Sequence, residues 1–382
     1  MRILHTADLH LGRSLHGQSL LEDQAHVLDQ LVSMARETTP DVILVAGDVY
    51  DRAVPAAEAV ALLDDTLGKL LIDVGVPVVL IPGNHDSPER LTFGARLLKA
   101  GNLHLFKHFG PNNIVTIADE HGPVDIYSVP FAEPPVARQE LDCPTVVDHN
   151  SAIREVVRRI RENRVAGRRS VLLAHAFVAG GEATESERPL VVGGAGAVEP
   201  VGLAGFSYVA LGHLHRPQTA GQENIHYAGS ILAYSFAEAD QVKSVNLVEI
   251  SPWGECKVER LPLQPRHAVR CATGPFEELK KGLTAGAAID DYLMITLQDR
   301  GPVLDAMGQL RQIYPNLLHV QRAEPVISGE AATVRLDHRR TSTDQLFSSF
   351  FRQATGQDLT EAESAAFAEV YQQSQIEMRE AA

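Results

Sequence analysis

The chain has 382 residues, of which 45% are hydrophobic and 22% charged, a composition typical of a globular protein with about two domains. It excludes a disordered or fibrous protein, and no apolar stretch approaches the run of about 18 residues that a membrane-spanning helix needs. The formal net charge of −15 argues against a protein that holds DNA by its overall charge alone. DNA binding would need locally gathered basic residues, metal ions or a partner.

The N-terminal segment and the cysteines favour a cytoplasmic protein, associated with the nucleoid if it acts on DNA. No apolar segment followed by a cleavage site opens the chain. Cys143, Cys256 and Cys271 are scattered without metal-ligand spacing, and their odd number argues against a disulfide framework. We expect them to be reduced.

Residues 1–264 alternate between predicted strands and helices, which favours a layered α/β domain. Ser19 and Glu22 form a predicted capping box for the first helix, and a second helix is predicted at 55–74. The later strands are close enough in sequence to favour antiparallel pairing. Strands are predicted at 3–4, 41–46, 77–81, 171–174, 208–211, 224–228 and 244–250. The expected architecture is two facing sheets flanked by helices, a four-layer α/β/β/α sandwich.

Two further regions follow. Residues 265–340 are predicted to form a small α+β domain, with strands at 268–272, 292–297 and 317–321 and helices near 276–283 and 304–314. Residues 341–382 are predicted to be helical, with apolar stripes that dock onto another surface. The stripes contain Leu346, Phe347, Phe350, Phe351, Leu359, Ala362, Ala366, Phe367, Val370 and Tyr371.

Metal-ligand residues follow five predicted strands in the first region. A single Asp or His at a strand end is more often a helix cap or a hydrogen-bonded structural residue. Five such ends in one domain are difficult to explain in that way and predict a metal centre. The five segments are Asp8-Leu9-His10, Gly47-Asp48, Gly83-Asn84-His85-Asp86, His175 and Gly212-His213-Leu214-His215.

The mixture of carboxylate, imidazole and amide groups fits two divalent cations about 3.5–4 Å apart, bridged by one carboxylate. We predict that Asp48 is the bridge. Asp8, His10 and His215 would complete one site, and Asn84, His175 and His213 the other. Such ligands suit Mn²⁺, with Fe²⁺, Mg²⁺ or Zn²⁺ as alternatives. The cations would also give a locally positive site in an acidic protein.

His85 is not needed as a ligand and is therefore predicted to contact the scissile phosphate or to protonate the leaving group. Asp86 is predicted to orient its second ring nitrogen. The alternative is that His85 has only a structural role behind the ligands.

This order of motifs resembles the calcineurin-like metallophosphoesterases, and nearly the whole chain resembles the SbcD family of bacterial nuclease subunits. The resemblance extends beyond the metal motifs to four longer segments: residues 1–12, 175–181, 210–217 and 227–230.

The resemblance implies a Mn²⁺-dependent exonuclease on double-stranded DNA and an endonuclease on single strands and hairpins, active in DNA repair, recombination and replication. It also implies a Rad50-like, SMC-type ATPase partner, SbcC, bound by the C-terminal helices, and a homodimer within a heterotetramer. The region 265–340 would cap the DNA. ATP would bind the partner only, and this chain has no Gly-rich phosphate loop.

Two positions depart from the family pattern. Asp51 stands where archaeal relatives have a histidine, and Ile231 stands where proline is common. The nearest alternative function is a calcineurin-like phosphomonoesterase, because residues 47–52 resemble its second motif. Those enzymes usually carry Glu at the position of Asp86 and lack the small domain. A scaffold without catalysis is disfavoured, because every ligand position holds a competent residue.

Two surface features remain open. Seven arginines between 154 and 169 would either follow a DNA backbone or form a solvated helix face. They are Arg154, Arg158, Arg159, Arg161, Arg164, Arg168 and Arg169. The segment 181–194 is a candidate for shaping substrate access, and 182–188 within it is expected to be mobile.

Overall fold

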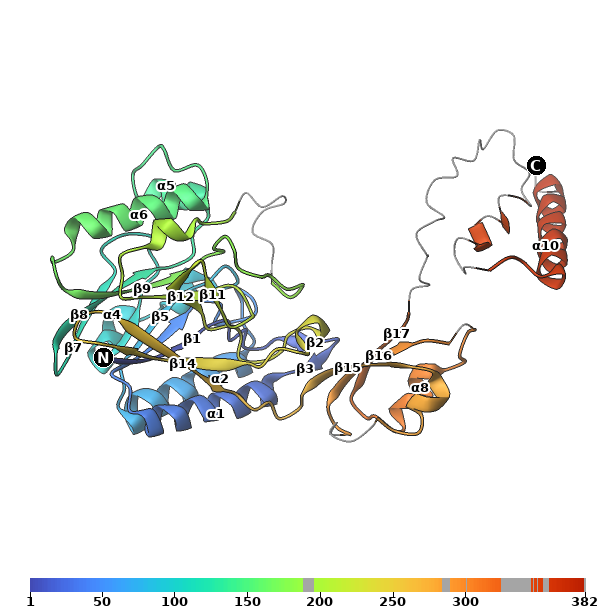
Figure 1. The fold of residues 1–382 in the computed structure, drawn as a ribbon, viewed down its shortest axis with the longest axis horizontal. Helices are drawn as coiled ribbons and strands as arrows, with labels where there is room; N and C mark the ends of the chain where they lie inside the picture. The colour runs from blue at the N-terminus through green and yellow to red at the C-terminus, as the bar shows by residue number, and fades with distance from the viewer. Residues whose placement is uncertain are drawn as a thin grey trace.

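The computed structural model describes residues 1–187, 196–283, 289–299, 301–323, 345, 347–348, 350–352 and 357–380. Residues 1–264, here called the N-terminal region, contain two six-stranded sheets (Figure 1). The first sheet has the order β14 (Cys256–Pro262), β13 (Ser244–Ile250), β1 (Arg2–Thr6), β4 (Val42–Ala46), β5 (Val78–Ile81) and β6 (Leu103–Leu105). The second has the order β11 (Gln218–Ala220), β12 (Gln222–Tyr227), β10 (Tyr208–Gly212), β9 (Arg169–His175), β8 (Gly122–Val129) and β7 (Ile114–Asp119).

Each sheet has a parallel centre and antiparallel edges. β1, β4, β5 and β6 run parallel, and β13 is antiparallel to both β1 and β14. β8, β9, β10 and β12 run parallel, with β7 and β11 antiparallel beside them. The predicted antiparallel pairing is wrong for β12, because the short strand β11 reverses the chain and returns it parallel to β10. Parallel strands bring their carboxyl ends to one edge of a sheet.

Alternating residues of each strand build separate apolar layers. In β1, Leu4 packs with α1 (Leu21–Thr38) and α2 (Ala57–Gly68) on the outer face of the first sheet. Ile3 packs between the two sheets, where it joins residues of β9 and β10. On the outer face of the second sheet, Val156 and its neighbours in α6 (His149–Asn163) cover the strands. This arrangement confirms the predicted α/β/β/α sandwich.

The sequence signals for single helices predict the structure less well than the strand pattern does. The predicted capping box is wrong: the N-cap of α1 is Leu20, whose side chain makes no cap hydrogen bond. Ser19 belongs instead to the small hairpin of β2 (Ser14–Leu15) and β3 (Gln18–Ser19). The predicted second helix divides into α2 and a π-helical segment, η1 (Lys69–Val74). The remaining short helices are α3 (Pro88–Leu91), α4 (Ala95–Leu98), η2 (Lys99–Gly101), α5 (Pro134–Glu140), η3 (Pro200–Leu203) and η4 (Phe236–Glu238).

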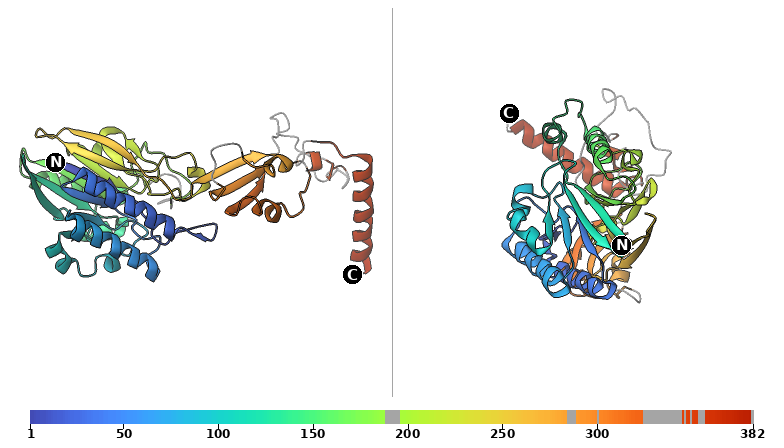
Figure 2. Two further views of the ribbon diagram at one scale, coloured as in Figure 1. Left: turned by 90° about the horizontal axis from the view of Figure 1, so that it is seen from below. Right: turned by 90° about the vertical axis from the view of Figure 1, so that its left-hand side faces the viewer.

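A third sheet lies beside the N-terminal region along the long axis of the molecule (Figure 2). Its strands β15 (Val269–Gly274), β16 (Tyr292–Leu297) and β17 (Leu317–Arg322) are parallel. One face is covered by α7 (Phe276–Leu279) and α8 (Ala306–Arg311). On the other face, Val269 and Tyr292 enter the apolar core of the N-terminal region. The hydroxyl of Tyr292 also donates to Asp23 of α1 over 2.8 Å.

The last helix, α10 (Glu361–Glu380), lies beyond the third sheet (Figure 1). The ring of Phe347 stacks on that of Phe367, with centroids 3.8 Å apart, whereas Phe350 and Val370 are 64% and 69% exposed. Part of the predicted apolar stripe, including Leu346, is outside the described residues. None of the helices within the described ranges is long and apolar enough to cross a membrane.

Candidate metal centre

The structure brings all seven predicted ligands together where the two facing sheets end. Asn84, after β5, places Oδ1 3.0 Å from Nε2 of His175 in β9 and 3.1 Å from Nδ1 of His213, after β10. His10, after β1, places Nε2 3.1 Å from Nε2 of His215. Each group therefore contains residues from both sheets.

Asp48 lies between the two groups. Its Oδ2 is 3.6 Å from Nε2 of His10 and 3.6 Å from Nε2 of His175. Asp8, which is fully buried, accepts hydrogen bonds from the backbone N–H of His213 at 2.9 and 3.1 Å. Oxygen or nitrogen atoms of Asp8, His10 and Asp48 all lie within 4.8 Å of one another. The position of Asp48 supports the prediction of a bridging carboxylate.

Four of these residues have left-handed backbone conformations, which are uncommon outside glycine. The φ angles are 52° at Asp8, 43° at His10, 49° at Asp48 and 111° at His213. Such conformations cost on the order of 1–3 kcal/mol each and persist where the surroundings enforce them. Here the N–H of Asp8 donates to the carbonyl of Gly47 at 3.0 Å, and that of His10 to Asp48 at 2.9 Å. The fold therefore holds the ligand loops before any cation binds.

Glycines let the loops approach one another closely. A Cβ added to Gly212 would lie 1.9 Å from the carbonyl oxygen of Ala46, across the two sheets. A Cβ added to Gly83 would lie 2.2 Å from Oδ1 of Asp48. Real Cβ atoms do not tolerate such distances, so both positions require glycine.

Burial keeps three of the imidazoles neutral. It lowers the pKa of His175 to about 4, and it also lowers the pKa values of His10 and His213, helped by neighbouring histidines. Burial, reinforced by the charge of Asp48, raises the pKa of Asp8. Neutral ring nitrogens with two mutually repelling carboxylates form a donor set that divalent cations would stabilise. The residues therefore fit the two cations that the sequence predicts.

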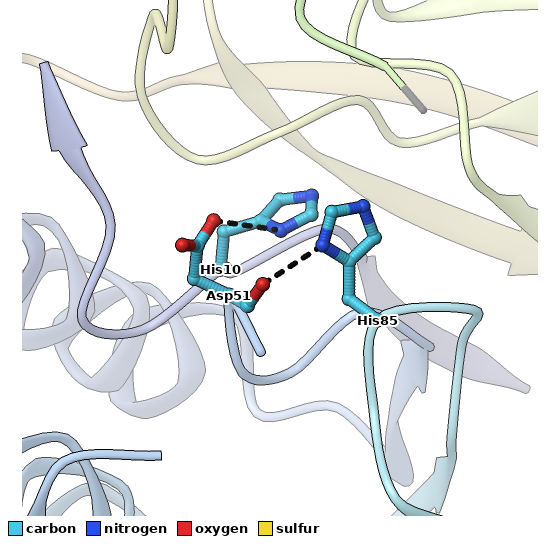
Figure 3. A group of neighbouring side chains, drawn as sticks. All are labelled: His10, Asp51 and His85. Carbon is cyan, nitrogen blue, oxygen red and sulfur yellow. Dashed lines mark hydrogen bonds and ion pairs between the residues drawn. The ribbon is translucent and has the colours of Figure 1, made fainter. Parts of the chain in front are cut away.

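His85 lies beside His10 and Asp51 (Figure 3), and atoms of these three residues lie within 4.8 Å of one another, a second group that could hold a cation. Its Nδ1 donates to the backbone carbonyl of Asp51 over 2.8 Å, and its own N–H donates to Asp48 over 2.9 Å. Its ring centroid is 4.7 Å from that of His10. Because Nδ1 is engaged, Nε2 remains for contact with a substrate.

The prediction that Asp86 orients His85 is wrong. The orienting acceptor is the Asp51 carbonyl, whereas the carboxylate of Asp86 accepts three backbone N–H groups. These come from Val49 at 3.0 Å, Tyr50 at 2.9 Å and Gly83 at 2.9 Å. Burial and the charge of Asp48 raise the pKa of Asp86 to about 6 despite these bonds. Asp86 thus ties together the loops after β4 and β5.

Sequence reasoning missed the residues that hold His215. Its N–H donates to Glu187 over 2.7 Å, and its Nδ1 lies 3.2 Å from Glu238 and 2.7 Å from the hydroxyl of Ser186. Lys243 donates to Glu238 over 2.6 Å and to the His215 carbonyl over 2.9 Å. Burial alone would raise the pKa of Glu238, but His215 and Lys243 hold it well below its usual value. These loop residues carry no motif that would have identified them.

The segment predicted to be mobile is partly described. Ser186 and Glu187 are fixed by their contacts with His215 and Glu238. Arg13 adds a contact from its guanidinium to the carbonyl of Ser186 at 3.1 Å. Residues 188–195 lie outside the described part of the chain, so the idea that the wider loop shapes substrate access stays a prediction.

Comparison with known proteins assigns the family. Residues 1–217 match the family model described as calcineurin-like phosphoesterase, and residues 265–355 match that described as type 5 capsule protein repressor C-terminal domain. The SbcD subunit of the SbcCD nuclease from Staphylococcus saprophyticus is 33% identical over 365 residues, covering 95% of this chain and 96% of that protein.

Two solved structures are also similar. One, from Thermus thermophilus, is 14% identical with a TM-score of 0.39 and covers 68% of this chain and 98% of its own. The other, a dimetal phosphatase from Danio rerio, is 11% identical with a TM-score of 0.40 and covers 69% of this chain and 99% of its own. These scores are too low to add to the assignment, which rests on the family model and the curated relative. The chain therefore belongs to the calcineurin-like phosphoesterases and, within them, to the family of SbcD nuclease subunits.

Proposed function

We propose that this chain is the DNA-cutting subunit of a complex with an SbcC-type ATPase, and that it hydrolyses phosphodiester bonds with two Mn²⁺ ions. The observation that carries this proposal is the full-length similarity to a nuclease subunit together with seven converging ligand side chains. When bound, the two cations would polarise the phosphodiester and activate a water molecule. Asp48 would hold both ions, and Nε2 of His85 would face the scissile phosphate or the leaving oxygen.

The finer activities are proposed on the basis of the same family membership. We propose ATP-dependent exonuclease action on double strands and endonuclease action on single strands and hairpins, in DNA repair, recombination and replication in the cytoplasm. The partner would bind the ATP, and the exposed apolar residues Phe350 and Val370 support a C-terminal docking surface for it. A homodimer would form the centre of a heterotetramer.

Cleavage of end-labelled linear and hairpin duplexes by the purified chain with Mn²⁺, with and without partner and ATP, tests the proposal. A phosphomonoester is assayed in parallel, and His85→Ala serves as the active-site control. Metal-dependent DNA cleavage that His85→Ala abolishes, and that partner with ATP stimulates, is the expected result. Monoester turnover without DNA cleavage would contradict it and favour a phosphomonoesterase.

A further inference from the structure

An open hollow of about 480 Å³ lies at the opposite ends of the strands that carry the metal ligands. Arg169 begins β9 and His175 ends it, so the hollow lies about 20 Å from the metal centre at about 3.3 Å per residue. We call it the arginine hollow. Its lining includes Arg161, Arg164, Arg168, Ser207, Trp253 and Gly254.

Two of these arginines converge without a carboxylate between them. Arg161 donates to the backbone carbonyl of Gly202 at 3.2 Å, and Arg164 donates to that of Gly205 at 2.5 Å. A Cβ added to Gly205 would lie 3.8 Å from Nε of Arg161 and 3.9 Å from Nη1 of Arg164, so both guanidinium groups flank one glycine. Burial and the nearby charge of Arg164 lower the pKa of Arg161.

Four other arginines of the same stretch differ, because acidic side chains neutralise them. Arg158 pairs with Glu155 and Glu162, and Arg159 pairs with Glu155. Arg168 pairs with Asp125 and Arg169 with Asp119. Among residues in the described ranges, no ion pair of this kind involves Arg161 or Arg164. Arg154 has no such pair among these residues either, but it does not line the hollow. Arg161 and Arg164 are therefore the two arginines of the hollow without an ion pair to a described carboxylate.

An aromatic ring is exposed in the same hollow. Trp253 is the only tryptophan in the chain and is 88% exposed in the turn between β13 and β14. Two backbone hydrogen bonds fix the turn. The N–H of Ser251 donates to the carbonyl of Glu255 at 2.8 Å, and the N–H of Gly254 donates to that of Ser251 at 3.1 Å. A single exposed apolar side chain is ordinary. An indole beside two uncompensated guanidinium groups has the composition of sites that stack a base and hold its phosphate.

We propose that the arginine hollow binds single-stranded DNA, with a phosphate on Arg161 and Arg164 and a neighbouring base stacked on Trp253. Guanidinium groups match phosphate oxygens in geometry and charge. A duplex keeps its bases stacked inside, so an exposed indole favours a single strand. The site also places positive charge locally in a chain whose formal net charge is −15. It lies outside the catalytic centre and goes beyond the proposed function.

Fluorescence of Trp253 in the full chain reports directly on this site, because no other tryptophan contributes. The titrant is an oligothymidylate of about twelve nucleotides, within the usual site sizes. EDTA prevents cleavage, so the result does not depend on nuclease activity. We expect saturable quenching. The Arg161→Gln/Arg164→Gln double variant should bind about tenfold more weakly. The slope of the logarithm of its binding constant against the logarithm of salt concentration should become shallower by about 0.7 for each lost phosphate contact.

Trp253→Ala provides a second variant, because its exposed side chain leaves the core intact. With an end-labelled strand read by anisotropy, it should lose about tenfold in affinity, and Trp253→Phe should recover most of this loss. Arg158→Gln is the matched control: it removes one charge from the same helix at an already neutralised position and should bind normally.

Unchanged fluorescence at strand concentrations that saturate the anisotropy signal would overturn the proposal. So would full affinity in both the double variant and Trp253→Ala. Equal, arginine-dependent binding of a duplex would overturn the preference for a single strand. Thymidine monophosphate binding as tightly as the oligonucleotide would make the hollow a mononucleotide site and likewise reject a strand.

Discussion

The two ends of β9 and β10 differ in the charge of their side chains and in the space around their backbone. At the carboxyl ends, His175 is buried and uncharged, and Gly212 touches the opposite sheet. At the amino ends, Arg169 lines a hollow and pairs with Asp119, and a Cβ added to Gly167 would meet no atom within 4 Å. The tightly packed, ligand-bearing residues therefore lie at one end of the strands, whereas the other end has room for larger side chains.

The largest effect is expected from Asp48→Asn. Loss of the bridging charge should lower the rate of DNA cleavage by at least about 1,000-fold and weaken Mn²⁺ binding. Cleavage assays and titration calorimetry with Mn²⁺ measure both quantities. Asp73→Asn, at an exposed position in η1, is the control and should behave like the wild type. Normal Mn²⁺ affinity in Asp48→Asn would exclude a bridging role.

His85→Ala separates chemistry from metal binding. Because Nδ1 of the ring donates to the Asp51 carbonyl and Nε2 is left to face the substrate, we expect cleavage to fall by about 100-fold to 10,000-fold with Mn²⁺ affinity unchanged. Single-turnover cleavage and calorimetry provide the two readings. The exposed His121 is a matched control for replacement of a histidine by alanine. A parallel loss of Mn²⁺ binding would reassign His85 to the ligand set.

A pair of glycine variants tests the comparison of strand ends through stability. Gly212→Ala forces a Cβ against Ala46 and should lower the free energy of unfolding by roughly 2–4 kcal/mol. Gly167→Ala has open space but a φ of +73°, so it should cost only about 1 kcal/mol. Urea unfolding followed by circular dichroism measures both. Equal losses would show that the close approach of the sheets is not the source of the constraint.

The smallest effect concerns pH at the amino ends. Arg169 holds the pKa of Asp119 well below its usual value, against the opposing effect of burial. A depressed pKa means that the pair stabilises the fold above about pH 4 and that this contribution is lost as the pH falls through the folded pKa. The difference in unfolding free energy between wild type and Asp119→Asn should therefore shrink between pH 6 and pH 3. A constant difference would show that charge on Asp119 does not contribute.

The sequence predicted that these seven residues would converge, because the signal is local. Each of the apolar strands that carry them ends at Asp, Asn or His or reaches one within three residues, and parallel strands necessarily gather such ends at one edge. The support of these ligands was not predictable in the same way. Three residues that hold His215 lie far from it in the sequence, and no motif marks them. They are Glu187, Glu238 and Lys243, which are 28, 23 and 28 residues away.

The errors have a similar origin. Asp86 follows His85 in sequence, which suggested a direct contact, but its side chain turns back to three amides of neighbouring loops. The capping box at Ser19 failed because pairing in the β2–β3 hairpin competes with helix capping. The parallel pairing of β12 with β10 was missed because the three-residue strand β11 is too short to give a periodic signal. In each case a tertiary contact outweighed a local pattern.

Adjacent residues at the start of α1 join two distant parts of the molecule. Asp23 accepts hydrogen bonds from Tyr292 and His267 beside the third sheet. The next residue, Gln24, donates to the carbonyls of His10 at 2.8 Å and Leu9 at 3.3 Å. Because one helical turn is stiff, a tilt of the third sheet would also displace the loop that carries the metal ligand His10. A force on the small domain would therefore reach the residues that hold the cations.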